Sequence, residues 1–138
     1  MAFYDLYSPF QGLNAIDNDS WTVRNCFVHM LAEDSIDIDA FRRLLENGGV
    51  SGDIDWGIEK WNSYSEDDHG IKSYFDGYLF FIGEEEHGLV GKGELQVILN
   101  KEEVKPYLIS IIEWYKHLPN SNVDDFIKLL KNNSLIEY

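Results

Sequence analysis

The side chains able to do chemistry are thinly spread along this chain of 138 residues. Its four histidines, His29, His69, His87 and His117, fall in four separate predicted elements, and no two are spaced at i and i+4. Cys26 lies three residues before His29 in a predicted helix, which is a conceivable Cys–His catalytic pair. However, the sequence around it has no glycine elbow and no third residue of a catalytic triad. We therefore interpret Cys26 as a core cysteine and His29 as a peripheral histidine.

Two acidic segments have some features of a cation site. Asp53-x-Asp55 has the spacing that opens a calcium loop, which needs oxygen ligands at positions five and twelve and Gly at position six. Counted from Asp53, those three positions hold Gly57, Tyr64 and Ile58. In Glu84-Glu85-Glu86-His87, consecutive turn residues point in divergent directions, which favours a solvated turn. We predict no metal ligand and no cofactor.

Other signatures of catalysis are missing from the sequence. Gly91-Lys92-Gly93 lacks the spacing of a phosphate-binding loop, and the chain has no Cys-x-x-Cys. Carboxylates are plentiful, but no pair is singled out for acid–base work. We therefore predict no catalytic residue, and we expect a protein that is not an enzyme.

The charge is the strongest global feature. The formal net charge is −14, and 19 of the 25 acidic residues fall in residues 1–100 together with only six of the eleven basic ones. Such a field repels nucleic acid and anionic membranes and attracts basic partners, although acidity also aids solubility. The N-terminus has no basic segment followed by an apolar run, and no apolar stretch reaches the ~18–20 residues of a membrane span. With a single cysteine, these features predict a cytoplasmic protein stabilised by packing.

Helical periodicity is clear at both ends of the chain. A first helix is expected after a cap at Asp19 or Ser20, and a second after Ser35 or Asp37, ending at Asn47-Gly48-Gly49. Asn100-Lys101-Glu102-Glu103 is typical of a third helix start, but Pro106 suits only a first turn, so the regular helix is expected a few residues after Asn100. A fourth follows a cap at Ser121 or Asn122. Their apolar stripes contain Val23, Cys26, Phe27, Met30 and Leu31; Ile38, Phe41, Leu44 and Leu45; Tyr107, Leu108, Ile111, Ile112 and Tyr115; and Val123, Phe126, Ile127, Leu129 and Leu130.

Strands are expected between the two helix pairs, in residues 74–99. Residues 74–83 form a short run that is dense in aromatic and β-favouring side chains and bounded by Gly. Leu89-Val90 is interpreted as a short return strand, and Leu95, Val97 and Leu99 alternate with polar residues. Residues 50–70 sustain neither period, which favours a loop or a short irregular strand. The prediction is one α+β domain over residues 1–138, in which an antiparallel meander of about three strands is flanked by an N-terminal and a C-terminal helix pair.

Residues 50–70 also mix tryptophan and tyrosine with carboxylates, which is typical of a recognition surface. The alternative is that Trp56 and Trp61 anchor the core beneath a solvated acidic rim. The candidate partner-binding residues are Asp53, Asp55, Trp56, Glu59, Trp61, Tyr64, Glu66, Asp67 and Asp68, joined by Glu84, Glu85, Glu86 and His87.

The second half of the chain carries a resemblance to a known family. Tyr74-Phe75-Asp76-Gly77 before an apolar strand, a second strand, and Tyr115, Pro119, Phe126 and Leu129-Leu130 in two closing helices resemble the immunity proteins of bacterial contact-dependent growth inhibition systems, in particular those paired with ribonuclease toxins. The resemblance covers roughly residues 70–131. It implies a small cytoplasmic antidote that binds one cognate nuclease domain and blocks its active site. From the residues themselves we expect 1:1 binding to a basic partner and a protein that is a monomer or weak dimer.

The residues support the same expectation independently, because an acidic protein can occupy the basic cleft in which a nuclease binds phosphates. Blockade of the active site and binding at an exosite both fit. Two alternatives stay open: an acidic adaptor or nucleic-acid mimic that is also non-enzymatic, and an enzyme that uses scattered carboxylates with or without a metal.

Overall fold

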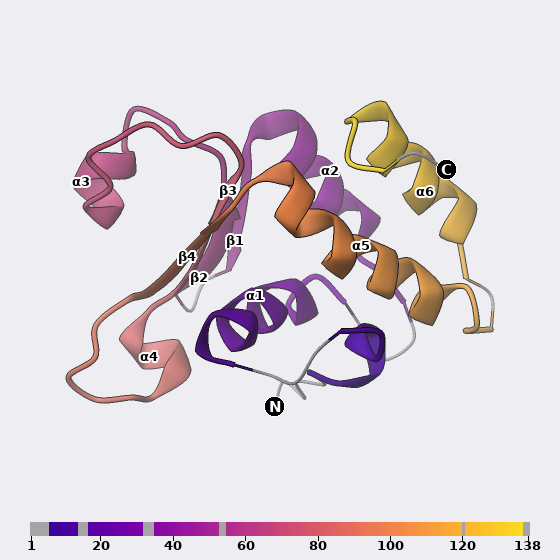
Figure 1. Cartoon of the computed structure of the whole chain (residues 1–138), viewed down its shortest axis with the longest axis horizontal. Coiled ribbons are helices and arrows are strands. Elements are labelled where there is room, and N and C mark those ends of the chain that lie inside the picture. The colour runs from indigo at the N-terminus through magenta and orange to yellow at the C-terminus, as the bar shows by residue number, and fades with distance from the viewer. Residues whose placement is uncertain (1–5, 14–16, 32–34, 53–54, 120, 137–138) are drawn as a thin grey trace.

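Four antiparallel strands, each paired with the next along the chain, form one sheet in the order β1-β2-β3-β4 (Figure 1). Their bounds are Gly49–Gly52, Trp56–Glu59, Tyr78–Ile82 and Leu95–Leu99. A computed structural model describes residues 6–13, 17–31, 35–52, 55–119 and 121–136. The fold is α+β with a β-meander between two helix pairs, as predicted, and the sheet has four strands where about three were expected.

The additional hairpin lies within residues 50–70, for which the sequence favours a loop or an irregular strand. Strands β1 and β2 have four residues each, and Val50 pairs with Ile58 while Gly52 pairs with Trp56. Four residues are too few to establish a period of two, and two of the four in β1 are glycines, which disfavour strands. Pairing of β2 with the strongly apolar β3 compensates for this weak local preference.

The N-terminal helix pair is confirmed. Helix α1 (Asn18–Val28) begins earlier than predicted, because the carboxylate of Asp17 accepts a hydrogen bond from the backbone N–H of Ser20 at 2.7 Å. Helix α2 (Ile38–Asn47) is capped by Asp37, one of the two predicted positions. It ends at Gly48, whose φ of 92° is the left-handed conformation that favours glycine.

The C-terminal pair consists of helices α5 (Lys101–Tyr115) and α6 (Val123–Asn132). Helix α5 begins directly after Asn100, so the helix start predicted at residues 100–103 is confirmed, and the expectation that the regular helix begins a few residues later was wrong. Asn100 and Glu103 form a reciprocal capping box that fixes the first turn. Pro106 then lies inside the helix, where its exposed position lets water solvate the backbone carbonyl that lacks a donor.

The return strand predicted at Leu89-Val90 does not form. Residues 88–94 are a loop in which Gly88, Gly91 and Gly93 have φ values of 73°, 83° and 66°, a conformation incompatible with an extended strand. Leu89 and Val90 are 51% and 90% exposed. The acidic turn before this loop is the one-turn helix α4 (Glu84–His87).

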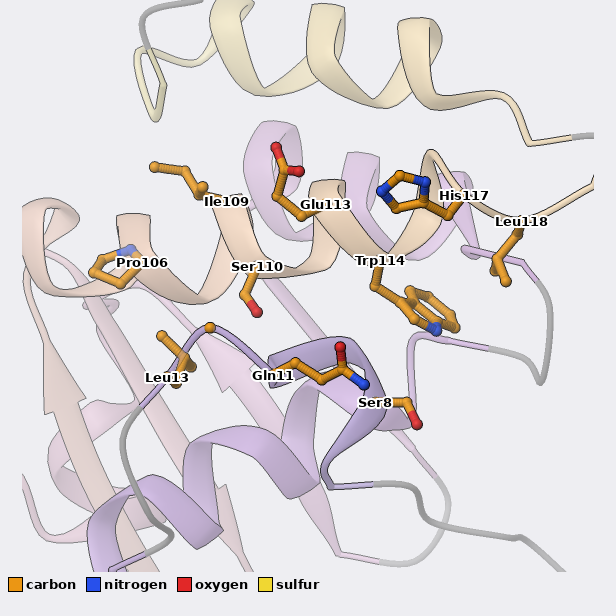
Figure 2. Close-up of a pocket in the computed structure, with 11 residues that line it drawn as sticks. Ser8, Gln11, Leu13, Pro106, Ile109, Ser110, Glu113, Trp114, His117 and Leu118 are labelled. Carbon is orange, nitrogen blue, oxygen red and sulfur yellow. The ribbon is translucent and has the colours of Figure 1, made fainter.

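The N-terminal segment packs on α5. It contains the short 3-10 helix η1 (Ser8–Phe10), and the hydroxyl of Ser110 donates a buried hydrogen bond to the carbonyl of Pro9 at 2.9 Å. The buried Arg24 guanidinium reaches the same segment, because its Nη1 donates to the carbonyl of Leu6 at 3.3 Å. A groove of about 750 Å³ lies between η1 and α5. Figure 2 shows side chains that line it.

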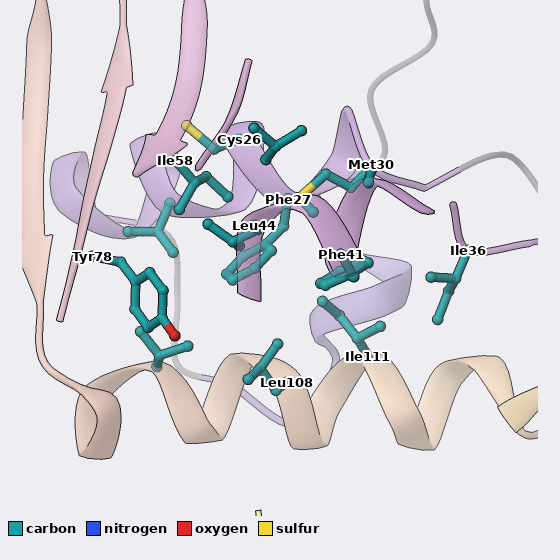
Figure 3. Close-up of a cluster of buried hydrophobic side chains, with 14 of the residues drawn as sticks. Cys26, Phe27, Met30, Ile36, Phe41, Leu44, Ile58, Tyr78, Leu108 and Ile111 are labelled. Atoms are coloured by element: carbon teal, nitrogen blue, oxygen red, sulfur yellow. The ribbon is translucent and has the colours of Figure 1, made fainter. Parts of the chain in front are cut away.

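The core lies between one face of the sheet and the helices. Phe27 of α1 meets Phe80 of β3 edge-on at 5.3 Å between ring centroids and Phe41 of α2 in a stack at 6.3 Å. Figure 3 shows Leu108 and Ile111 of α5 pointing toward the same cluster. Helices α1, α2, α5 and α6 all lie on this side of the sheet (Figure 1).

Candidate interaction surface

The face of the sheet opposite α1 carries the candidate site. Strand alternation places Val50, Ile58 and Phe80 toward the helices, so their neighbours point the other way. The residues on this second face are Glu59, Leu79, Phe81, Gln96 and Ile98, with Gly57 opposite Phe81 in register. Leu79 and Phe81 are only 0% and 8% exposed, so this second face is covered as well.

The cover comes from the segment between β2 and β3. This segment contains the one-turn helix α3 (Ser65–His69), which Figure 1 shows on the side of the sheet away from α1 and α5. The fully buried Ser65 hydroxyl accepts a hydrogen bond from the backbone N–H of Asn62, and Gly70 ends the helix with a φ of 71°. The ring of His69 lies 4.3 Å from the ring of Phe81.

The side chain of His69 attaches α3 to β2 and to the residue before β4. Its Nε2 is 3.0 Å from a carboxylate oxygen of Glu59 on β2, and its Nδ1 is 2.7 Å from Oε1 of Glu94, the residue before β4. The side-chain amide of Gln96 donates to the same Glu94 oxygen and to the backbone carbonyl of His69. Helix α3 is therefore fixed by polar contacts as well as by packing on Phe81.

Glu59 has an unusual environment for a carboxylate. Burial raises its pKa, and the negative charges of Asp68 and Glu94 act in the same direction. The positive charge available on His69 and a hydrogen bond with Asn62 oppose these effects. The pKa of the half-buried Glu59 is therefore raised, and the contacts with His69 and Asn62 offset part of this shift.

The segment between β2 and β3 presents acidic and aromatic side chains. Glu66, Asp67 and Asp68 are exposed on α3, and the flanking Tyr64 and Tyr74 are 66% and 70% exposed. Trp61 is half-buried, and its ring meets Tyr74 and Phe75 edge-on at 5.9 and 5.8 Å. We call this set the acidic-aromatic surface: Glu59, Trp61, Tyr64, Glu66, Asp67, Asp68 and Tyr74.

Six members of this surface were predicted from the sequence. Tyr74 was not among the candidates, although its position beside Phe75 in an aromatic pair was a usable signal. Glu94 and Gln96 were also missed as supporting residues, since nothing in their local sequence shows that His69 folds back onto them.

Three further candidates, Asp53, Asp55 and Trp56, come from the turn between β1 and β2 and from the first residue of β2, and none of them belongs to the acidic-aromatic surface. Trp56 is 8% exposed and stacks on His29 with ring centroids 4.5 Å apart, so it is a core anchor, as the alternative interpretation held, and not a surface contact. Asp55 is exposed in the turn, and its backbone carbonyl accepts a hydrogen bond from Gly83. Asp53 lies outside the described residues.

In the second predicted group, residues 84–87, two side chains form hydrogen bonds within the protein. The Glu84 carboxylate accepts hydrogen bonds from the backbone N–H groups of Gly91 and Gly93 at 2.9 and 3.1 Å, and these bonds lower its pKa. His87 accepts at Nδ1 from Leu89, and its Nε2 lies 2.6 Å from the Gly93 carbonyl. Both side chains thus hold the 88–94 loop in shape.

The remaining two members of that group differ from each other. Glu86 lies 3.0 Å from His29 Nε2 and ties α4 to the end of α1, whereas Glu85 is exposed. Figure 1 shows α4 beyond one end of the strands, apart from α3. The two predicted acidic groups therefore do not form one continuous patch centred on α3.

Cys26 and His29 do not form a catalytic pair. The Cys26 sulfur points to the carbonyl oxygens of Gly57 and Phe81 at 3.6 and 3.5 Å, and burial raises the pKa of its thiol far above the ordinary value. His29 instead contacts Glu86 and Trp56. Burial lowers the pKa of His29, while the neighbouring Glu86 opposes this shift.

The groove between η1 and α5 is a separate feature. Figure 2 shows Ser8, Gln11 and Leu13 facing residues of α5 and its following turn, among them Ser110 and Trp114. None of the predicted partner-binding residues lines it. Among the described residues, no group of three His, Cys, Asp or Glu side chains is arranged to hold a metal ion.

No protein-family model, no curated protein and no solved structure matches the chain. Within the part of the chain that the structure describes, no helix has the length and apolar character needed to cross a bilayer.

Proposed function

We propose that this protein is an immunity protein that acts in the cytoplasm, where it binds and neutralises the nuclease domain of a cognate bacterial toxin. We propose a ribonuclease as this partner. The observation that carries the proposal is the acidic-aromatic surface. Three exposed carboxylates on α3 are flanked by two tyrosines that are 66% and 70% exposed. The resemblance of residues 70–131 to immunity proteins favours the same function.

The surface has the composition that such binding requires. Tyrosine rings supply rigid contact area with little loss of side-chain entropy, and carboxylates pair with the lysines and arginines that line a nuclease cleft. The net charge of −14 adds long-range attraction, which can raise an association rate by ~10–10³-fold at low salt. We expect a 1:1 complex whose formation slows as the salt concentration rises.

An inhibitor of this kind needs no reacting groups of its own. Its effect follows from occupying the partner's cleft or an adjacent site, and the proposal holds for either. We therefore propose a non-enzymatic protein without a cofactor, in which the surface over α3 supplies the contacts.

The decisive experiment uses the product of the gene immediately upstream, because immunity genes follow their toxin genes. The two proteins are mixed and separated by size-exclusion chromatography, and nuclease activity is measured with and without this chain. A stable complex that abolishes cleavage supports the proposal. If the nuclease domain is folded and active but forms no complex, the proposal fails and an acidic adaptor becomes the better hypothesis.

A further inference from the structure

Strand β4 forms one edge of the sheet. Among the described strands its one neighbour is β3, and Figure 3 shows the strand that leads into α5 as the outermost of the four. On the second face of the sheet, its side chains are the exposed Gln96 and Ile98, which is 41% exposed. An edge strand presents backbone N–H and C=O groups with which another extended chain can pair.

One backbone hydrogen bond shows which residues of β4 point outward. The N–H of Gly83, directly after β3, donates to the carbonyl of the residue before β2. Successive residues of an antiparallel strand bond to opposite neighbours, so Phe80 faces β4 and bonds to its register partner Val97. The residues on either side of it, Gln96 and Ile98, therefore direct their N–H and C=O groups away from β3. Among the described residues, no other segment bonds to these backbone groups.

The sequence of β4 lacks the features that usually protect an edge. Sheets protect exposed edges with charged residues, proline, bulges or very short strands. The five residues of β4, Leu95–Leu99, include no charged residue, proline or glycine, and their register with β3 is continuous. Strand β1, at the opposite edge, has four residues, of which two are glycines. Of the two edges, β4 is thus the one whose composition favours pairing with a further strand.

The edge of β4 adjoins the acidic-aromatic surface. The side-chain amide of Gln96 donates to the backbone carbonyl of His69, the last residue of α3, at 2.7 Å. Glu94, directly before β4, has a carboxylate oxygen 2.7 Å from Nδ1 of the same histidine. A strand that lies along β4 is therefore placed beside the helix that carries the exposed carboxylates.

Charge indicates which kind of strand fits this edge. A second copy of the chain brings another formal charge of −14, and like charges disfavour association, whereas a basic protein is attracted. The side chains of an added strand alternate between the two faces of the sheet. Those on the face of α3 meet the exposed side of Ile98 and the carboxylates of the helix. An apolar residue and a lysine or arginine are the side chains that match these two neighbours.

We propose that the outer edge of β4 binds an extended strand of the basic nuclease partner, which joins the sheet as an additional strand beside α3. Its main chain exchanges hydrogen bonds with Gln96 and Ile98, and alternate side chains provide the apolar contact and the basic group. The identity of this partner rests on the proposed function. The added strand supplies main-chain contacts to a complex in which the acidic-aromatic surface supplies side-chain contacts.

Amide hydrogen exchange, followed residue by residue by NMR on the isotope-labelled full chain, tests the edge. In the free chain, the N–H groups of Gln96 and Ile98 are expected to exchange at least about tenfold faster than that of Val97. In the complex with the upstream nuclease domain, exchange of these two groups should slow by about tenfold or more.

The possible outcomes separate this proposal from the proposed function. A complex that abolishes cleavage but leaves the exchange of Gln96 and Ile98 unchanged overturns the edge as the docking site, while the proposed function stands. Failure to form any complex with a folded, active nuclease domain overturns both. Protection of the two groups in the free chain that rises with its concentration would place a second copy at the edge, and it also overturns the proposal.

A matched pair of proline variants tests the main-chain contacts. Ile98→Pro removes an outward N–H without removing a hydrogen bond to β3, and an edge strand tolerates proline at such a position. Ser51→Pro is the control at the β1 edge, where the bond from Lys60 to Gly48 places the N–H of Ser51 outward by the same alternation. We expect Ile98→Pro to weaken binding by about tenfold or more and Ser51→Pro by less than about twofold.

A third variant separates the main-chain contact from the side-chain contact. Ile98→Thr keeps the N–H and the preference for an extended chain, so it should bind more tightly than Ile98→Pro. Circular dichroism checks that each variant is folded, and the exchange experiment on the unaltered chain decides the matter if Ile98→Pro is not. Equal binding by folded Ile98→Pro and the wild type overturns the proposal.

Discussion

The ring of Phe81 lies over Gly57 on the neighbouring strand, so close that a Cβ at position 57 would overlap it. The same ring supports His69 from below. Because Gly57 has no side chain, the Phe81 ring can occupy this space and pack against His69 of α3.

Substitution Gly57→Ala is expected to lower the free energy of unfolding by about 1–3 kcal/mol, because the ring must move in a packed environment. Urea denaturation of the full chain measures this. Gly12→Ala is the matched control, since the nearest atom to a Cβ placed at position 12 is 4.0 Å away. Equal stability of the two variants would show that Phe81 can move at no cost.

Two asparagines at helix starts provide a second matched test. Asn100 makes both hydrogen bonds of a capping box, whereas the side chain of Asn122 makes no capping bond. We expect Asn100→Ala to cost about 1 kcal/mol and Asn122→Ala a few tenths. Thermal or urea unfolding distinguishes them, and a larger loss for Asn122→Ala would contradict the assignment of the α5 cap.

Charge reversal tests the acidic-aromatic surface. Glu66→Lys combined with Asp67→Lys should slow association with the nuclease domain by about tenfold or more at low salt. The control is Asp124→Lys with Asp125→Lys, which changes the net charge equally and also alters the first turn of a helix. Equal association rates for the two double variants would place the interface away from α3.

Stability at mildly acidic pH should depend on His29. Burial lowers its pKa in the folded state, so the unfolded chain binds a proton more readily once the pH falls below the ordinary histidine value of 6.5. Stability is therefore lost as the pH falls, and the loss is larger in Glu86→Gln, where the opposing carboxylate is removed.

The measurement compares Glu86→Gln with the double variant His29→Phe, Glu86→Gln by urea denaturation at about pH 7 and about pH 5. The double variant should lose less stability on acidification. An identical loss in both would mean that His29 binds its proton equally well in the folded and unfolded states.

The thiol of Cys26 should be unreactive toward thiol reagents in the folded protein. Its burial and raised pKa keep it as a thiol, and the thiolate is the reactive form. Reaction with a disulfide reagent is expected to be at least ~1,000-fold slower in the native protein than in urea. Labelling of the native chain at a rate near that of the unfolded chain would contradict this burial.

Local sequence signals sufficed for much of the fold. Asp37 and Gly48 mark the ends of α2, and the aromatic and β-favouring run in residues 74–83 predicts the strand that the structure shows as β3, buried on both faces. The first hairpin escaped prediction because its strands are short and rich in glycine, and their pairing depends on β3. Helix α5 starts earlier than Pro106 suggests, because the capping box outweighs a proline at an exposed position.

The sequence predicts which residues belong to the candidate surface, but it does not predict the tertiary contacts that bring them together. Residues 59–68 do gather over one face of the sheet, yet they do so because His69 reaches Glu94, which lies 25 residues away in sequence. Likewise, Glu84 and His87 look like exposed turn residues until the backbone of the 88–94 loop is in place to bond their side chains. These side-chain hydrogen bonds depend on tertiary contacts, which the spacing of apolar residues in the sequence does not predict. The assignment of the surface as a binding site stays a prediction.

The hydrogen bond from Ser110 to Pro9 spans 101 residues. During synthesis, the segment containing η1 leaves the ribosome long before the helix that receives it, whereas the strands of the meander can pair as each one emerges. The η1 segment is therefore one of the last parts to settle, and until α5 is complete the apolar side chain of Phe10 lacks its final packing. A nascent chain stalled before Ser110 should accordingly be recognised by chaperones at this segment.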